Sequence, residues 1–281
     1  MSTLHYVGFP SLHAAPLTIS GRLCSPEGVG PHPAVIILHG SSGPTEREGG
    51  YAGTLNDAGF VTLEPDQWSA RSRSSGERWR PDSVHETLPD LFGARGFLAA
   101  RADVDASRIG VLGFQFGGAA AMLAATRAVD QSFASDGSFA AFLAFYPVCH
   151  LYNRVAGFEF ADLVPSPILI ATAALDEYDD DPGAGSALVK SLPALDRAKI
   201  RTAVFYGAHH AFDMLGPRRQ VEHPAAHRGD GGLVTVAFDP EAAGRAHGLA
   251  VQFFSEMRGR PTRSHNGSSE RARAGHADVD L

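Results

Sequence analysis

The feature that most constrains this fold is the run Arg108–Gly118, RIGVLGFQFGG, together with the apolar segment Ala119–Ala125 that follows it. Apolar and β-branched residues lead into a cluster of glycines, and small residues continue beyond it. This pattern predicts a strand, a sharp turn and a helix, with glycine wherever two backbones pass closely. The chain must therefore contain a buried strand whose carboxyl end runs directly into a helix.

The spacing Gly113-x-Gln115-x-Gly117 is that of a nucleophile elbow, the turn that presents a nucleophile above the sheet of an α/β hydrolase. The central position holds Gln115, where such an elbow has serine or cysteine. A glutamine amide has no ionisable proton and cannot form an acyl-enzyme. The chemistry that a hydrolase-like scaffold performs without its usual nucleophile is therefore the main functional question.

Apolar and amphipathic segments alternate along the rest of the chain. This alternation predicts an α/β fold with a mostly parallel central sheet and helices on both faces. An opening antiparallel hairpin is expected at 4–9 and 17–23, with further strands at 34–39, 60–64, 108–114, 139–146, 168–173 and 198–206. Helices are expected at 47–58, 83–100, 116–130, 186–192 and 240–257, and loops at 67–81 and 216–232.

Length and composition indicate one large domain. The chain has 281 residues, of which 44% are hydrophobic, and no second hydrophobic core or internal repeat is visible. We expect a single α/β-hydrolase domain over residues 1–258. Residues 259–281 are polar, charged and aperiodic, which predicts a disordered tail.

Charge and hydropathy exclude several classes of protein. The net charge is −7 and the isoelectric point about 6.0, which argues against a nucleic-acid partner. No apolar run is long enough to span a membrane, and the first residues lack the pattern of a signal peptide. Cys24 and Cys149 are far apart in the sequence, which is typical of free thiols in a reducing compartment. A cytoplasmic location is expected.

Polar residues follow several of the predicted strands, at the edge of the sheet where α/β proteins bind ligands. Ser41 follows the strand at 34–39, Gln115 and Phe116 follow the elbow strand, Asp176 follows the strand at 168–173, and His210 follows the last strand. The chain order of elbow, acid and histidine is that of α/β-hydrolase triads. These residues are expected to form one site.

Three segments resemble the dienelactone hydrolase family: VIILHGSSGP at 35–44, the RIGVLGFQFGG elbow, and FYGAHHAFD at 205–213. The resemblance covers roughly residues 15 to 258. It implies that Asp176 is the triad acid and His210 the base. It also implies that the backbone N–H groups of Phe116 and of a residue near Ser41 form the oxyanion hole, with Gln115 at the position of the nucleophile.

The sequence departs from that family at two places. One is Gln115, where the family has cysteine or serine. The other is Met214, which stands where the family has an arginine that binds the substrate carboxylate. Arg71 resembles the family's second arginine, with one residue inserted before it, and is a candidate contact for an anion. Its alternative is a flexible basic loop with Arg73, Arg78 and Arg80.

Other residues leave alternatives open. Asp179, Asp180 and Asp181 crowd the loop of Asp176 and are alternative acids or solvated charges. Cys149 is either a displaced nucleophile or a small buried thiol. His209 has the character of a surface histidine, and Trp68 and Trp79 either pack a loop or contact the substrate.

The expected partner is a small-molecule substrate. No phosphate loop, nucleotide fingerprint or cofactor lysine is present, and the histidines lack metal-ligand spacing; no cofactor or metal is expected. The oligomeric state is not encoded in any pattern.

Gln115 allows three interpretations. In the first, His210 deprotonates a water that Gln115 orients, and the protein hydrolyses a small ester, lactone or related carbonyl compound. In the second, His210 abstracts a proton next to a carbonyl, as in an isomerase, lyase or cyclase that tailors a natural product. In the third, the protein binds a small molecule without turnover.

Overall fold

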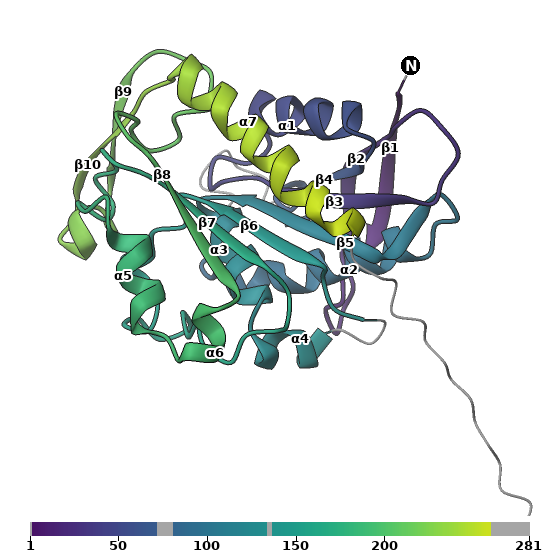
Figure 1. Cartoon of the computed structure of the whole chain (residues 1–281), viewed down its shortest axis with the longest axis horizontal. Coiled ribbons are helices and arrows are strands. Elements are labelled where there is room, and N and C mark those ends of the chain that lie inside the picture. The colour runs from purple at the N-terminus through teal and green to yellow at the C-terminus, as the bar shows by residue number, and fades with distance from the viewer. Residues whose placement is uncertain (1, 72–80, 134–136, 260–281) are drawn as a thin grey trace, which may run out of the picture.

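The computed structural model describes residues 2–71, 81–133 and 137–259, and in this part of the chain eight strands form one sheet (Figure 1). Their order is β1-β2-β4-β3-β5-β6-β7-β8. The strands are β1 (Thr3–Pro10), β2 (Thr18–Ser25), β3 (His32–Leu38), β4 (Val61–Asp66), β5 (Val104–Phe114), β6 (Ala141–Phe145), β7 (Ile168–Ala173) and β8 (Ile200–Phe205). β2 pairs antiparallel with β1 and β4, and the other neighbours pair parallel. The predicted α/β fold with a mostly parallel sheet is confirmed.

Helices cover both faces of this sheet (Figure 1). One face carries α1 (Glu46–Asp57) and α7 (Pro240–Ser255), and the other carries α2 (Leu88–Ala99), α3 (Phe116–Ala124), α4 (Arg127–Phe133), α5 (Ala184–Ser191) and α6 (Ala194–Arg197). Short 3₁₀ turns are η1 (Ser69–Arg71), η2 (Val84–Thr87), η3 (Cys149–Leu151), η4 (His227–Gly229) and η5 (Glu256–Gly259). None of the helices in the described ranges is both long and apolar enough to cross a bilayer.

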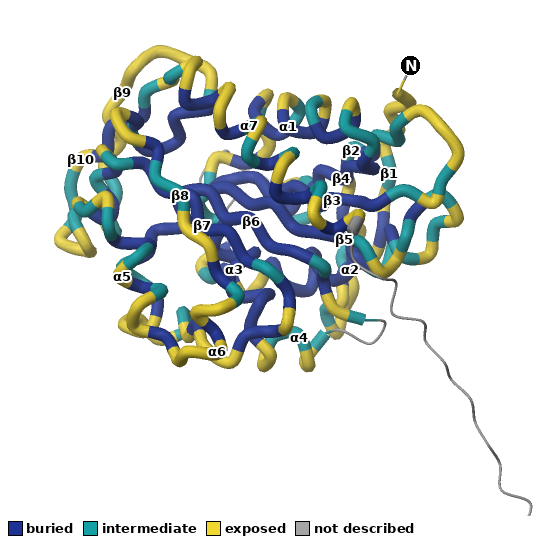
Figure 2. Tube along the Cα trace, viewed as in Figure 1, coloured by how far each residue is buried: buried dark blue, intermediate teal, exposed yellow. Residues whose placement is uncertain are grey.

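The central strands are buried (Figure 2). Alternate residues of β3 belong to two separate hydrophobic cores, one on each face of the sheet. Ile36 and Leu38 pack toward α2 and α3, whereas Val35 and Ile37 pack toward α1 and α7. This follows from the two-residue period of a strand. The continuous apolar run at 34–38 is thus explained by a sheet sandwiched between two helix layers.

Three predicted segments differ from the structure in the kind or number of elements that they contain. The helix expected at 83–100 is the 3₁₀ turn η2 followed by α2, with Pro89 in the first turn, where its missing N–H costs nothing. The helix expected at 116–130 divides into α3 and α4. The loop expected at 216–232 contains β9 (Arg219–His223), which pairs with β10 (Gly232–Val236) in a second, two-stranded sheet.

Some predictions fall on residues outside the described ranges. The central part of the arginine-rich loop, including Arg73, Arg78, Trp79 and Arg80, lies there. So does the predicted disordered tail, apart from Gly259.

Candidate active site

The predicted elbow is present at the end of β5. Gln115 joins β5 to α3 with φ 48° and ψ −103°, a region that side-chain-bearing residues rarely adopt. A Cβ on Gly113 would lie 2.0 Å from the carbonyl oxygen of Gly117, and a Cβ on Gly117 would lie 2.5 Å from that of Leu38. Glycine is therefore a steric requirement at both positions, and the turn is retained in full around a glutamine.

The side chain of Gln115 is bound to Ser41. Its Oε1 accepts hydrogen bonds from the backbone N–H of Ser41 at 3.0 Å and from the Ser41 hydroxyl at 2.7 Å. Only the carbonyl oxygen of an amide accepts from a backbone N–H, so these contacts fix the amide orientation. The N–H group of Ser41, one of the two predicted oxyanion donors, is thus already bonded to Gln115, and the Gln115 amide keeps its NH₂ group as a donor.

His210 and Asp176 lie together, as the order of the motifs predicts. His210 Nδ1 is 2.7 Å from Asp176 Oδ2, and the two side chains are 5% and 6% exposed. Asp176 Oδ1 also accepts the backbone N–H of Tyr178 at 3.0 Å. The Nδ1–H donates to the carboxylate, which leaves Nε2 of the neutral ring as a proton acceptor. This contact favours Asp176 over its acidic neighbours as the partner of His210.

The position of His210 is braced from several sides. Its backbone bridges to Val236 of β10. The rings of Tyr146 and Tyr178 have their centroids 4.9 and 4.5 Å from that of the imidazole. The two-stranded sheet that the sequence did not predict therefore supports the histidine, and the loop it belongs to is not free to swing. His209, by contrast, only approaches Glu177, at 3.9 Å.

A buried polar network lies under the elbow. Asp213 accepts hydrogen bonds from the hydroxyls of Tyr51 and Tyr146, and Arg47 donates to the Tyr146 hydroxyl at 3.0 Å. Arg47 also pairs with Glu48 at 2.6 Å. Burial and the Asp213 carboxylate raise the pKa of Tyr51 well above its usual value, so its hydroxyl remains a donor.

This network lies close to Gln115, on the other side of Gly40. A Cβ on Gly40 would lie 3.3 Å from Nη2 of Arg47 and 3.4 Å from Oε1 of Gln115, so the guanidinium borders the elbow. Burial opposes ionisation of Glu48, but Arg47 outweighs it and holds the pKa of Glu48 below its usual value. The sequence signals available were the capping box of Thr45 and Glu48 and the Asp213 that closes the histidine motif.

Arg71 is engaged by the fold. Its Nη1 lies 2.7 Å from Asp90 and 2.6 Å from the carbonyl oxygen of Gln67, and its Nη2 donates to the carbonyl of Glu86. To contact a substrate anion, its guanidinium would have to leave these partners. The role of Arg71 as an anion contact stays a prediction.

Cys149 and Trp68 take structural positions. Burial, and then the neighbouring carboxylate of Asp179, raise the pKa of the Cys149 thiol well above its usual value. A thiol that stays protonated is a poor nucleophile, which favours the buried-thiol alternative. Trp68 is 7% exposed and makes edge contacts with the rings of His39 and Phe116. The described residues contain no group of three or more side chains suited to hold a metal.

Comparisons with known proteins identify the family. The sequence profile of the dienelactone hydrolase family matches residues 19–258. A solved structure from Klebsiella pneumoniae subsp. pneumoniae superposes with a TM-score of 0.65 at 18% identity, covering 91% of this chain and 99% of the other. A search of curated proteins finds no match.

Two further structures share the fold. A dienelactone hydrolase-like promiscuous phosphotriesterase from metagenomic libraries has a TM-score of 0.63 at 21% identity, covering 91% of this chain and 98% of its own. Esterase 2 of Thermogutta terrifontis, solved phosphoramylated by tabun, has a TM-score of 0.61 at 16% identity, covering 90% and 94%. At these low identities the superpositions show a shared α/β-hydrolase fold.

Proposed function

Because this chain belongs to the dienelactone hydrolase family, we propose that it hydrolyses a small ester or lactone without a covalent intermediate. The observation that carries the proposal is the hydrogen-bonded pair of His210 and Asp176. In the same structure, the oxygen of the Gln115 amide accepts hydrogen bonds from Ser41, so its NH₂ group remains as a donor. A vestigial site has no need of a buried, correctly oriented imidazole.

In the proposed reaction, His210 Nε2 removes a proton from a water molecule as the water oxygen attacks the substrate carbonyl carbon. The carbonyl π electrons move to the carbonyl oxygen, which accepts hydrogen bonds from the N–H of Phe116 and the NH₂ of Gln115. The tetrahedral intermediate then expels the alkoxide, which takes its proton from the imidazolium. Asp176 stabilises that imidazolium throughout.

The expected rate matches an activated carbonyl compound. A general base contributes about 10²–10⁴-fold and one oxyanion donor about 10²–10³-fold. Without nucleophilic catalysis, these factors suit esters and lactones better than amides. The substrate class of the proposal is therefore a small ester or lactone.

A second candidate is proton transfer at carbon. The bond between Gln115 Oε1 and Ser41 removes one oxyanion donor and substitutes the amide NH₂ for it. An enolate oxygen can accept from that NH₂ while His210 holds the proton taken from the neighbouring carbon. This is the chemistry of an isomerase, lyase or cyclase, and it needs no nucleophile at position 115.

The test is a burst assay with p-nitrophenyl acetate and butyrate on the native chain and on Gln115→Ser. The proposal expects steady turnover without a burst from the native chain, and turnover about 10²–10⁴-fold lower in His210→Ala. An inert native chain, together with a stoichiometric burst from Gln115→Ser, contradicts it.

The second candidate has its own readout. It expects His210-dependent exchange of a carbon-bound proton with deuterated solvent and no hydrolysis product. A chain that retains a small molecule but does neither reaction is a binding protein.

A further inference from the structure

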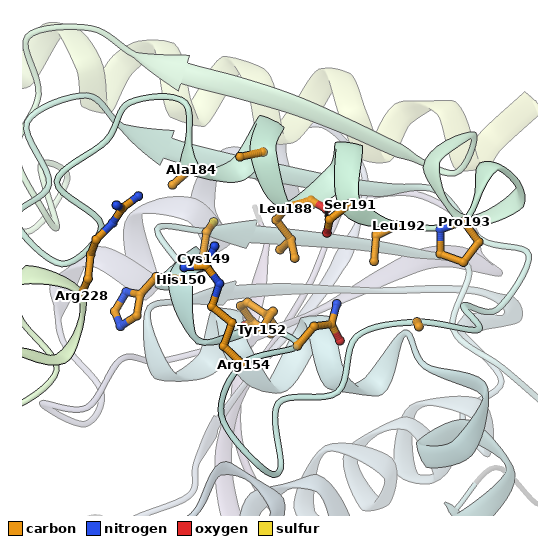
Figure 3. A pocket seen from close by; sticks show the side chains of 13 residues that line it. Cys149, His150, Tyr152, Arg154, Ala184, Leu188, Ser191, Leu192, Pro193 and Arg228 are labelled. Atoms are coloured by element: carbon orange, nitrogen blue, oxygen red, sulfur yellow. Dashed lines mark hydrogen bonds between the residues drawn. The ribbon is translucent and has the colours of Figure 1, made fainter.

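A cavity of about 400 Å³ lies between η3 with the residues after it and the helix α5 (Figure 3). This volume is within the range of small-molecule sites. Neither Gln115, Asp176 nor His210 is among the residues that line it. The cavity is therefore a separate feature from the proposed catalytic site.

One wall of the cavity is apolar. Ala184, Ala187 and Leu188 project from one side of α5, as residues three and four apart do on a helix. Leu192 and Pro193 extend this wall beyond the helix. It offers an apolar surface to the body of a ligand, away from charged groups.

The opposite end is cationic. In Figure 3 the side chains of Arg154 and Arg228 lie at the end of the cavity that holds Cys149 and His150, away from Leu192 and Pro193. Arg228 is anchored, since its Nε donates to the carbonyl of Asp179 at 3.1 Å and its Nη2 lies 3.7 Å from Asp181. Arg154 forms no ion pair with any residue that the structure describes.

The acid at this end is already committed. Asp179 is buried and accepts the backbone N–H groups of Cys149 and His150 at 2.9 and 2.8 Å, and His150 Nδ1 lies 3.1 Å from it. The His150 side chain is 7% exposed, and its Nε2 is buried without a hydrogen-bond partner in the described ranges. Because Asp179 is occupied by these groups, the two arginines, Arg154 and Arg228, are the side chains at this end of the cavity that can bind an anion.

We propose that this cavity is a second binding site, which takes a small carboxylate with an apolar aliphatic or aromatic body. The carboxylate lies between Arg154 and Arg228, and the body packs against Leu188 and the end of α5. Hydrolysis of an ester or lactone releases a carboxylate, so the ligand class is one that the proposed reaction generates. The site itself does not depend on that reaction.

The experiment is calorimetric titration of the full chain with hexanoate and phenylacetate. Hexanol, which has the body without the charge, and inorganic phosphate, which has a charge without the body, serve as control ligands. We expect saturable binding of one carboxylate per chain and at least about tenfold weaker binding of both controls, because a charge-assisted hydrogen bond and apolar burial each contribute.

Variants locate the site. Arg154→Gln removes an exposed cation and is expected to weaken hexanoate binding about tenfold or more. Leu188→Trp, whose fold is checked by circular dichroism, fills the cavity and is expected to abolish binding. The matched control Arg245→Gln, an exposed arginine on α7, is expected to bind as the native chain does, and so is His210→Ala.

The proposal is overturned by any of four results: no binding to the native chain, equal binding of hexanol or phosphate, native affinity in Arg154→Gln, or loss of binding in His210→Ala. The last result places the carboxylate in the proposed catalytic site. Each of them can be obtained even if Leu188→Trp fails to fold.

Discussion

Asp176 and Asp179 lie on one loop of this protein, and the buried histidine–aspartate pairs that they form differ in their surroundings. Asp176 pairs with His210 at 2.7 Å, and Asp179 pairs with His150 at 3.1 Å, in both cases through Nδ1. The other oxygen of Asp176 accepts one backbone N–H, whereas Asp179 accepts the backbone N–H groups of both Cys149 and His150. The first carboxylate orients an imidazole, and the second chiefly anchors the turn η3.

The comparison teaches that a histidine–carboxylate contact does not by itself mark a catalytic pair. The difference lies in what surrounds each pair. His210 follows β8 at the carboxyl edge of the sheet, in common with Gln115 and Ser41, whereas His150 lies on the wall of a cavity beside α5. Substitutions in the His210–Asp176 pair should therefore mainly lower activity, and substitutions of Asp179 should mainly lower stability.

The largest expected effect is the loss of turnover when His210, and not His150, is replaced by alanine. His210→Ala is expected to lower kcat/KM for p-nitrophenyl acetate by about 10²–10⁴-fold, the contribution of a general base. His150→Ala is the matched control and is expected to stay within about threefold of the native chain, because it contributes nothing to that reaction. Equal losses in both variants would remove the distinction between the pairs.

The next effect concerns the amide beside Ser41. Gln115→Glu keeps an oxygen that can accept from Ser41 but replaces the NH₂ donor with a negative charge. We expect kcat to fall about 10²–10³-fold, as for loss of an oxyanion donor. Gln115→Ala removes donor and acceptor together and serves as the reference. Any further fall in kcat in Gln115→Glu beyond that of Gln115→Ala measures the repulsion between the carboxylate and the oxyanion. A fully active Gln115→Glu chain excludes a donor role.

The two aspartates should separate activity from stability. Asp176→Asn is expected to lower kcat about 10²-fold, since an amide does not stabilise the imidazolium. Asp179→Asn is expected to lower the free energy of unfolding by about 1–3 kcal/mol, because one of two backbone N–H groups then meets an NH₂ donor. Urea unfolding and initial rates on both variants measure this, and an exchange of the two phenotypes contradicts the comparison.

The smallest expected effect is on the pH dependence of stability and comes from Glu64, a buried carboxylate that is not paired with a histidine. Burial raises the pKa of Glu64 to about 7, although Arg22 at 3.7 Å opposes the shift. Because the folded pKa exceeds the unfolded one, the contribution of Glu64 to stability is most favourable at acidic pH and is lost as the pH rises from about 4.5 through 7.

Glu64→Gln should remove that dependence. At pH 8 we expect it to gain about 1–2 kcal/mol over the native chain, with no gain at pH 4, where Glu64 is protonated in both states. Chemical unfolding at the two pH values measures the difference. A constant offset between the two chains would show that Glu64 does not titrate in this way.

The sequence anticipated the parts of the site that local patterns encode. The elbow is readable because glycine is the only residue that fits at 113 and 117. The meeting of Asp176 and His210 is readable because parallel strands end at one edge of a sheet, so motif order translates into proximity. These predictions needed no knowledge of side-chain conformations.

The rest depends on tertiary contacts. The strand β9 is polar and almost wholly exposed, so it has no alternation of apolar residues to reveal it, yet its partner β10 braces His210. The bond of Gln115 to Ser41 joins residues 74 positions apart. Arg71 is held by Asp90, an acid buried in α2 that no local pattern distinguishes from a solvated one.

The left-handed backbone at Gln115 ties the site to the stability of the whole molecule. A side chain held there costs on the order of 1 kcal/mol or more, and the two cores on either side of the sheet must absorb it. Native chains keep only a small margin above the threshold for folding. A destabilising core substitution far from the elbow therefore lowers the same free energy of unfolding that offsets the strain at Gln115. A stabilised variant of this chain should tolerate new side chains at position 115 better than the native chain does.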